Sequence, residues 1–444
     1  MKHLETICVQ GGWQPGNGEP RVLPIYQSTT FKYSSTEEMA DLFDLKKEGY
    51  FYTRLANPTN DAVAAKINEL EGGVGCVLTS SGQAANFFAV MNICSAGDHI
   101  IAANAIYGGT FNLFGVTLEK MGISCTFINQ NSSDEEIEAA FRPNTKCLFG
   151  ETISNPGGEV FDIERFAGIA HRHGVPLIVD NTFATPVNCR PFEWGADIVT
   201  HSTTKYMDGH ATQVGGAVID SGNFDWNANA GKFPGLCTPD ESYHGITYTE
   251  SFGRKAYITK ITTQLMRDLG SIPGPMNCFL LNLGLETLHL RMPRHCENAL
   301  AVAKWLKAND KVAWVHYCGL EDDPYHDLAR KYLPNGSCGV LAFGLKGSRE
   351  DAVKFMDSLK FVAIVTHVAD ARTCILHPAS HTHRQLSDQQ LKEAGVAPDL
   401  MRLSVGIENV EDIIADLSQA LEGVYGCCEV HIEAAMMLYR MEEV

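Results

Sequence analysis

Short apolar runs alternate with amphipathic segments over the central part of the chain. The runs are apolar at nearly every position, which is typical of strands that are buried on both faces of a sheet. The segments between them carry apolar residues at the three- and four-residue spacing of helices. This alternation predicts an α/β protein whose mostly parallel sheet is covered on both sides. We expect seven strands, within 75–81, 98–104, 124–129, 146–151, 175–180, 196–202 and 213–219.

The rest of the pattern divides the chain into four parts. Residues 1–60 are rich in Gly, Pro, Tyr and Thr and predict an extended N-terminal arm. Residues 61–280 form the large domain, although the alternation is lost within 221–275, where we expect a long loop. A long helical region then leads into a smaller α+β domain over 281–423. Residues 424–444 are a tail to which the sequence assigns no role.

Composition and charge narrow the class of protein. The chain has 444 residues, of which 45% are hydrophobic and 20% charged, as in folded globular proteins. Its 35 Lys and Arg face 53 Asp and Glu, giving a formal net charge of −18. Such a charge repels phosphate backbones and anionic lipid, so neither nucleic acid nor a membrane surface is an expected partner. We see neither a secretory signal nor an apolar run of membrane-spanning length.

The cysteines and histidines do not form a metal-ligating pattern. The 14 cysteines are scattered and include no C-x-x-C pair. His377, His381 and His383 are close in sequence, but no cysteine or fixed set of carboxylates accompanies them. We therefore expect no metal site, and we expect reduced, mostly buried thiols in a cytoplasmic protein.

Four of the predicted strands end at residues with useful chemistry, and the carboxyl ends of parallel strands are where such sheets bind ligands. Asp180 ends one strand, and its carboxylate could hold a proton on a heterocyclic nitrogen. Lys205 follows another strand, and a desolvated amine can form an imine with a carbonyl. Ser81 and Gly82 stand where a strand gives way to a helix, whose N-terminus can hold an anion. Tyr107 could stack on a flat cofactor.

Each of these residues also has an ordinary structural interpretation. Asp180 and Ser81 are typical helix caps, Lys205 is typical of a solvated surface, and Tyr107 of a core or surface aromatic. Taken together, however, an anion site, a ring stack, a carboxylate and an amine match one cofactor, pyridoxal phosphate.

Eight motifs in the chain carry a family resemblance. They are YTRLANPT (52–59), SSGQAA (80–85), YGGT (107–110), ETISNP (151–156), VDNTFATP (179–186), HSTTKYMDGH (201–210), HPASHTH (377–383) and RLSVGIE (402–408). Over about residues 3–422 the chain resembles the pyridoxal-phosphate enzymes of cysteine and methionine metabolism. The resemblance implies a PLP-dependent transferase of fold type I, in which a large domain with a mostly parallel seven-stranded sheet is followed by a smaller C-terminal α+β domain.

The resemblance also implies roles for individual residues. Lys205 would hold the cofactor and act as general base, Asp180 would pair with the pyridine nitrogen, and Tyr107 would stack on the ring and is a second candidate for proton transfer. Further cofactor contacts would come from Ser81, Gly82, Gln83, Thr182, Ser202 and Thr204, and from Tyr52 and Arg54 of a neighbouring subunit. Asn155 and Arg402 would hold the substrate carboxylate, a task that suits the bidentate guanidinium.

Several details are similar to the sulfhydrylase branch of this family, among them Asn112, the long 221–260 region and HVADAR at 367–372. Ala369 stands where the family usually has Gly, and His381 where threonine is common. The resemblance therefore implies γ-replacement on O-acetyl-L-homoserine with sulfide or methanethiol, giving L-homocysteine or L-methionine and acetate, in a homo-oligomer, typically a tetramer. Methionine γ-lyase and cystathionine γ-synthase are alternatives within the family, and a catalytically silent scaffold is the alternative from another class.

Overall fold

The computed structural model describes residues 2–380 and 399–425 and divides the chain into two compact units. Unit 1 holds residues 1–152 and 161–289, and unit 2 holds residues 153–160 together with the chain from 290 onward. The short segment 153–160 therefore belongs with the C-terminal part of the chain, although it lies in the middle of the sequence. Across the described residues, no helix is both long enough and apolar enough to cross a membrane.

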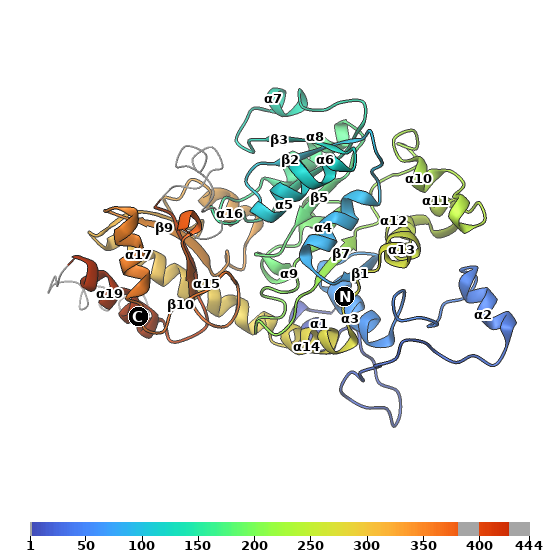
Figure 1. Cartoon of the computed structure of the whole chain (residues 1–444), viewed down its shortest axis with the longest axis horizontal. Helices are drawn as coiled ribbons and strands as arrows, with labels where there is room; N and C mark the ends of the chain where they lie inside the picture. Colours follow the sequence, from blue (N-terminus) through green and yellow to red (C-terminus); the bar gives the residue numbers. More distant parts are fainter. Residues whose placement is uncertain (1, 381–398, 426–444) are drawn as a thin grey trace. The chain divides into compact units, whose positions relative to one another are not determined.

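Unit 1 is built on a seven-stranded sheet with the order β1-β7-β6-β5-β4-β2-β3 (Figure 1). Its strands are β1 (Gly75–Thr79), β2 (His99–Ala103), β3 (Ser124–Ile128), β4 (Thr145–Glu151), β5 (Leu177–Asp180), β6 (Ile198–His201) and β7 (Gly216–Asp220). β7 is antiparallel to β1 and β6, and the other neighbours are parallel. All seven predicted strands are present, so the predicted mostly parallel α/β sheet is confirmed.

Helices precede the sheet, connect its strands and pack against it. Those up to residue 194 are α1 (Leu4–Gln10), α2 (Thr36–Phe43), α3 (Pro58–Glu71), α4 (Gly82–Met91), α5 (Gly108–Asn112), η1 (Leu113–Thr117), α6 (Leu118–Lys120), α7 (Asp134–Glu138), α8 (Ile163–Arg172), α9 (Thr185–Asn188) and η2 (Pro191–Trp194). The two ends of α3 follow from local sequence. At the N-terminus the Asn57 side chain caps the helix and Pro58 is its first residue, and at the C-terminus Gly72 ends the helix with φ 82°. α4 packs on β6 and β7, and α8 on β4 and β5.

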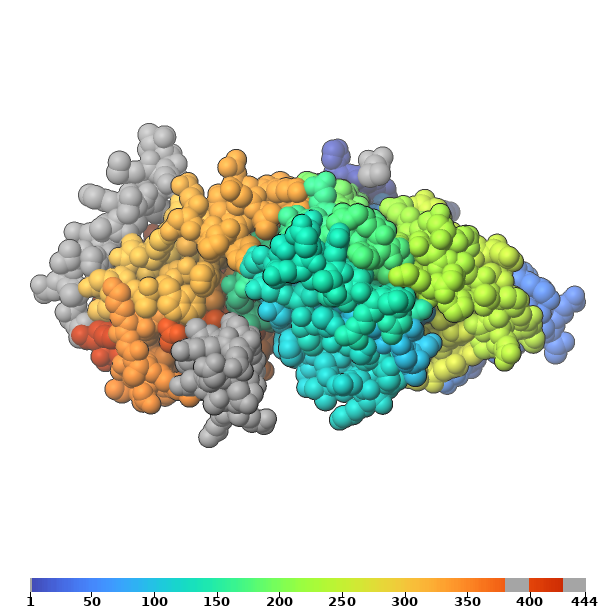
Figure 2. All heavy atoms as spheres, turned by 90° about the horizontal axis from the view of Figure 1, so that it is seen from above, coloured from blue at the N-terminus to red at the C-terminus, as the bar shows by residue number. Residues whose placement is uncertain are grey.

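Residues 221–275 do not form the expected long loop. They contain seven helical turns of three to six residues each: α10 (Pro234–Cys237), η3 (Glu241–Tyr243), α11 (Tyr248–Phe252), η4 (Gly253–Lys255), α12 (Ala256–Lys260), η5 (Ile261–Met266) and α13 (Arg267–Leu269). Trp226 stacks on Tyr257 with ring centroids 5.5 Å apart, and the Tyr257 hydroxyl donates to the Ala89 carbonyl at 2.8 Å. Figure 2 shows residues near 221–250, in yellow-green, as a close-packed body. The expectation was wrong because elements this short carry no readable periodicity and are fixed by buried aromatics.

The helix α14 (Pro275–Glu286) closes unit 1, and α15 (Leu288–Ala308) leads into unit 2. Unit 2 has a five-stranded sheet in the order β10-β11-β12-β9-β8. Its strands are β8 (Val312–His316), β9 (Val340–Leu345), β10 (Ala363–Ile364), β11 (Cys374–Leu376) and β12 (Met401–Ser404), and its other helices are α16 (His326–Tyr332), α17 (Arg349–Asp357), η6 (Pro378–Ser380) and α19 (Val410–Tyr425). Buried side chains of α15, β9, α17 and α19 form its core. His381, His383 and residues 426–444 lie outside the described residues.

Candidate active site

The carboxyl ends of β1, β5 and β6 meet at one edge of the unit 1 sheet. β5 and β6 are parallel neighbours, with Asp180 opposite Thr200. Beyond these ends, the Ser202 backbone N–H donates to Thr182 Oγ1 at 2.8 Å. A Cβ added to Gly82 would lie 2.6 Å from the Ser202 Cβ, so the start of α4 touches the same place. Three segments that are distant in sequence thus form one edge, as the strand pattern predicted.

The N-terminus of α4 offers an anion site at this edge. Ser81 caps the helix, because its Oγ accepts the Ala84 N–H at 3.1 Å. The N–H groups of Gly82 and Gln83 lie in the first turn, where a helix has no acceptors of its own. Gly82 lets the start of α4 lie directly against Ser202, since any side chain there would collide with Ser202. The arrangement fits a phosphate group.

Asp180 is held in a defined orientation by three donors. Its Oδ1 accepts hydrogen bonds from the Thr182 backbone N–H at 3.0 Å and the Thr182 hydroxyl at 2.5 Å. Its Oδ2 accepts from the Asn86 Nδ2 at 3.2 Å. The carboxylate is partly buried at the end of β5. A fixed carboxylate in this position fits the partner of a protonated ring nitrogen.

Lys205 lies on a turn that begins one residue after β6. Its backbone N–H donates to the Ser202 carbonyl at 3.2 Å, and its carbonyl accepts the Gly209 N–H at 2.8 Å. The residue is half-buried. Thr204 fastens this turn, since its hydroxyl donates to the Gly215 carbonyl at 3.2 Å and accepts the Gly215 N–H at 3.0 Å. This hydroxyl therefore has backbone partners, and its phosphate contact stays a prediction.

Tyr107 precedes α5, and its side chain is 49% exposed. Its backbone N–H donates to Oε1 of Glu151 at 2.7 Å, and Glu151 is buried at the end of β4. On the first turn of α5, the Thr110 hydroxyl donates to Oε1 of Gln83 at 3.3 Å. The segment that carries the aromatic ring is thereby tied to the end of β4 and to the anion site of α4.

Tyr52 and Arg54 belong to the arm and are both exposed. The Arg54 guanidinium carbon lies 5.1 Å from the centroid of the Tyr52 ring. Arg54 also borders a cavity of about 370 Å³ that residues of α3 and β1 line. The contact of Tyr52 and Arg54 with the cofactor of a neighbouring subunit stays a prediction.

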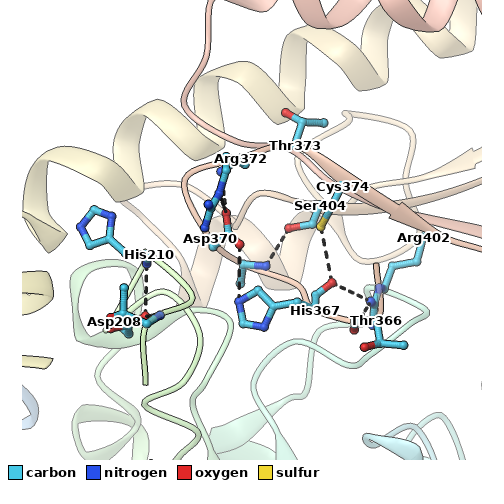
Figure 3. Close-up of polar contacts among 12 residues, drawn as sticks. Asp208, His210, Thr366, His367, Asp370, Arg372, Thr373, Cys374, Arg402 and Ser404 are labelled. Carbon is cyan, nitrogen blue, oxygen red and sulfur yellow. Dashed lines mark hydrogen bonds and ion pairs between the residues drawn. The ribbon is translucent and has the colours of Figure 1, made fainter. Parts of the chain in front are cut away.

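In unit 2, the structure brings together Arg402 and Asn155, the two residues that the resemblance assigns to the substrate carboxylate. Arg402 lies on β12 with 6% of its surface exposed, and its Nη1 donates to Oδ1 of Asn155 at 3.2 Å. Its Nη2 lies 3.2 Å from the Thr366 carbonyl and 3.3 Å from that of His367 (Figure 3). These oxygens orient the guanidinium, whose planar donors suit a carboxylate.

Sequence reasoning missed the buried side chains that support this edge. Asn86 contacts Asp180, and it could have been noticed because it follows Gln83 by three residues and therefore shares its helix face. At the last residue of β6, just before the Lys205 turn, Nε2 of His201 lies 2.5 Å from Oε1 of Glu71. The Asn181 amide donates to the same oxygen at 3.0 Å. No local signal joins Glu71 to His201, since they are 130 residues apart.

The sheet edge therefore holds a helix N-terminus, an oriented carboxylate, a lysine on a tight turn and an aromatic side chain. These are the groups that a pyridoxal phosphate site requires, so the residues present fit that cofactor. The fold and the site together define an enzyme of the pyridoxal-phosphate class.

Comparison with known proteins gives the family. Residues 5–422 match the model of the Cys/Met metabolism PLP-dependent enzymes, and the chain belongs to this family, whose cofactor is pyridoxal phosphate. It is 45% identical to the homocysteine synthase of Schizosaccharomyces pombe, over 95% of this chain and 98% of that protein. It is 43% identical to O-acetyl-L-homoserine sulfhydrylase 1 of Thermus thermophilus, over 94% of this chain and 99% of that protein.

A solved structure agrees with the fold. The crystal structure of a putative O-acetylhomoserine (thiol)-lyase from Campylobacter jejuni matches 95% of this chain and 100% of its own, with a TM-score of 0.91 and 36% identity. That protein contains N'-pyridoxyl-lysine-5'-monophosphate at its position 205. The predicted family, fold class and cofactor are thus confirmed.

Proposed function

We propose that this protein is an O-acetyl-L-homoserine sulfhydrylase, which exchanges the acetate of O-acetyl-L-homoserine for sulfide and releases L-homocysteine. The observation that carries the proposal is similarity over nearly the whole chain to proteins named homocysteine synthase and O-acetyl-L-homoserine sulfhydrylase. When bound, pyridoxal phosphate withdraws electrons from the substrate carbon next to the amino group.

The residues at the sheet edge divide the work. Lys205 holds the cofactor and moves the proton of the substrate's α-carbon as general base. Asp180, oriented by Thr182, holds the proton on the ring nitrogen. Tyr107 stacks on the ring, and either Lys205 or Tyr107 takes a proton from the substrate's β-carbon.

The remaining site residues bind charged groups. The first turn of α4, with Ser81, Gly82 and Gln83, receives the cofactor phosphate, and Ser202 and Thr204 add contacts. Arg402 and Asn155 hold the substrate carboxylate, which supports a reaction on amino acids.

Product analysis tests the function. The purified protein with pyridoxal phosphate is given O-acetyl-, O-succinyl- or O-phospho-L-homoserine together with sulfide, methanethiol or L-cysteine, and L-methionine alone in a parallel reaction. Homocysteine from the acetyl ester and sulfide, at the highest kcat/KM of the panel, is the expected result. Cystathionine from a homoserine ester and cysteine, or ammonia and a keto acid from methionine, would instead identify the synthase or the lyase.

The matched variant is Lys205→Ala, for which we expect loss of turnover and of the visible absorbance of the bound cofactor. Turnover with an unchanged spectrum would contradict the role of Lys205. A protein that stays colourless with added pyridoxal phosphate would support the silent scaffold.

We further propose that Tyr52 and Arg54 complete the site of a second copy of the chain, in a homo-oligomer, typically a tetramer. The arm that carries them has exposed apolar side chains, such as Tyr26 and Phe43, and α2 projects from the body of unit 1 in both views (Figures 1 and 2). Mixing of Lys205→Ala and Arg54→Ala chains tests this. If Arg54 acts on its neighbour, random pairing restores one intact site in each hybrid dimer, or about a quarter of the wild-type activity. No recovery after verified subunit exchange would contradict it.

Localisation in the cytoplasm is also a proposal. None of the cysteines in the described ranges forms a disulfide. Thiols remain reduced in the cytosol, whereas oxidising compartments favour disulfides.

A further inference from the structure

Asn86 has an unusual place among the site residues. It lies on α4, one turn after the residues that form the anion site, and its side chain is buried, with 2% of its surface exposed. Its Nδ2 donates to Oδ2 of Asp180 at 3.2 Å and to Oγ1 of Thr110 at 3.2 Å. Its Oδ1 accepts the Thr200 hydroxyl at 2.6 Å. One amide therefore contacts three separate segments.

The chemistry of the partners fixes the orientation of this amide. A carboxylate can only accept, so the group facing Asp180 has to be the NH₂. The Thr200 hydroxyl is fully buried on β6, and it donates to the amide oxygen on the other side. Because all the polar atoms of the Asn86 side chain have partners, rotation of the amide would break several buried hydrogen bonds at once.

The contacts of Asn86 extend to three parts of the predicted cofactor site: the carboxylate, the segment after Tyr107 and, through Thr110, the anion site. Asp180 faces the ring nitrogen under the proposed function. The helix α5 begins directly after Tyr107, and Thr110 lies on its first turn. The Thr110 hydroxyl donates to Oε1 of Gln83, a residue of the anion site. A shift of Asn86 would therefore disturb the carboxylate, the stacking segment and the anion site together.

We propose that Asn86 is a positioning residue for the cofactor. Its amide holds the Asp180 carboxylate toward the ring nitrogen and fixes the position of that carboxylate relative to α4 and α5. None of the eight family motifs includes Asn86. The inference rests on the proposed role of Asp180, and it adds a residue that acts on the cofactor only through another side chain.

The test compares Asn86→Leu with a matched control, Asn92→Leu. Asn92 follows the last residue of the same helix, has the same 2% exposure, and donates to the Tyr257 carbonyl at 2.9 Å, far from Asp180 in the hydrogen-bond network. Each protein is stripped of cofactor and titrated with pyridoxal phosphate, and the visible absorbance of the loaded protein is followed against pH. Leu has nearly the branched shape of Asn and removes the amide without adding a charge.

We expect Asn86→Leu to weaken pyridoxal phosphate binding roughly tenfold, the effect of one hydrogen bond to a charged group, and to shift the pH midpoint of the absorbance change. Asn92→Leu should change neither. Thr200→Val, which removes only the donor to the Asn86 oxygen, should move the same midpoint in the same direction and by less. It also serves if Asn86→Leu does not fold.

Asp180→Asn separates this inference from the function on which it rests. If Asp180→Asn leaves binding and spectrum unchanged, the role of Asp180 is wrong and the inference falls with it. If Asp180→Asn changes both while Asn86→Leu and Thr200→Val behave like Asn92→Leu, the inference alone is overturned. In the double variant of Asn86 and Asp180, an effect no larger than that of Asp180→Asn supports action through the carboxylate, and fully additive effects contradict it.

Discussion

Asp220 gives the sharpest prediction about stability. It ends β7 and is 2% exposed, and its Oδ1 accepts the Gly222 N–H at 2.8 Å. Burial raises the pKa of Asp220 from 3.8 to about 7, and the nearby Asp197 adds to this, while the backbone N–H groups of Gly222 and Ile258 and the charge of Arg254 oppose it. Between about pH 4 and pH 7, Asp220 is therefore protonated in the folded protein and ionised in the unfolded chain.

The sign and size of the effect follow from this difference. A carboxyl group whose pKa is higher in the folded state contributes stability that is complete below about pH 4 and is lost as the pH rises through about 7. Over that whole window the loss is about 4 kcal/mol, and between pH 5 and pH 8 it is roughly 2–3 kcal/mol. Asp220→Asn cannot ionise, so its stability relative to the native protein should rise by that amount from pH 5 to pH 8.

Thermal unfolding measured at several pH values tests the prediction. In a domain of this size, we expect the melting-temperature difference between variant and native protein to change by roughly 3–6 °C from pH 5 to pH 8. Asp225→Asn makes the same charge change on an exposed residue nearby and should show no such trend. A difference for Asp220→Asn that stays constant with pH would refute the reasoning, whatever its absolute value.

Catalysis should not change in this variant. β7 is antiparallel to β6, and Asp220 pairs with Ile198, the first residue of β6, whereas Lys205 follows the last. Asp220 therefore lies at the sheet edge opposite the candidate site. A large loss of kcat in Asp220→Asn would mean that the two edges are coupled.

Three further predictions concern buried hydrogen bonds. Arg402→Lys should lower kcat/KM roughly 10- to 100-fold, because an ammonium cannot bind a carboxylate with two parallel hydrogen bonds, and steady-state kinetics with unchanged cofactor binding will check this. Glu71→Ala should destabilise the protein by about 2–5 kcal/mol, since it leaves His201 and Asn181 without their shared acceptor, and Glu71→Gln should recover part of the loss in thermal unfolding. Asp416→Ala should cost about 2–4 kcal/mol in the same assay, since its carboxylate accepts the three successive N–H groups of residues 360–362 at 2.9–3.0 Å; a change below about 0.5 kcal/mol would contradict this.

Local sequence determined much of this protein. Apolar runs and their flanking residues gave seven strands, because a strand buried on both faces needs apolar side chains at every position. The same residues marked the strand ends, so the amino-acid order alone was enough to single out Asp180 and Lys205 as candidate site residues. The caps of α3 were equally readable, since they depend on neighbours within a few residues.

Only the tertiary structure decided which of these segments meet and what supports them. Asn86 and Asp180 are 94 residues apart, and Glu71 and His201 are 130 apart, yet each pair is joined by a buried hydrogen bond. The helical turns within 221–275 are likewise set by aromatic contacts across the chain and not by periodicity. The physical reason is that a pattern of residues records whether a side chain is buried, whereas its partner is chosen by the packing of elements that the chain brings together from distant positions.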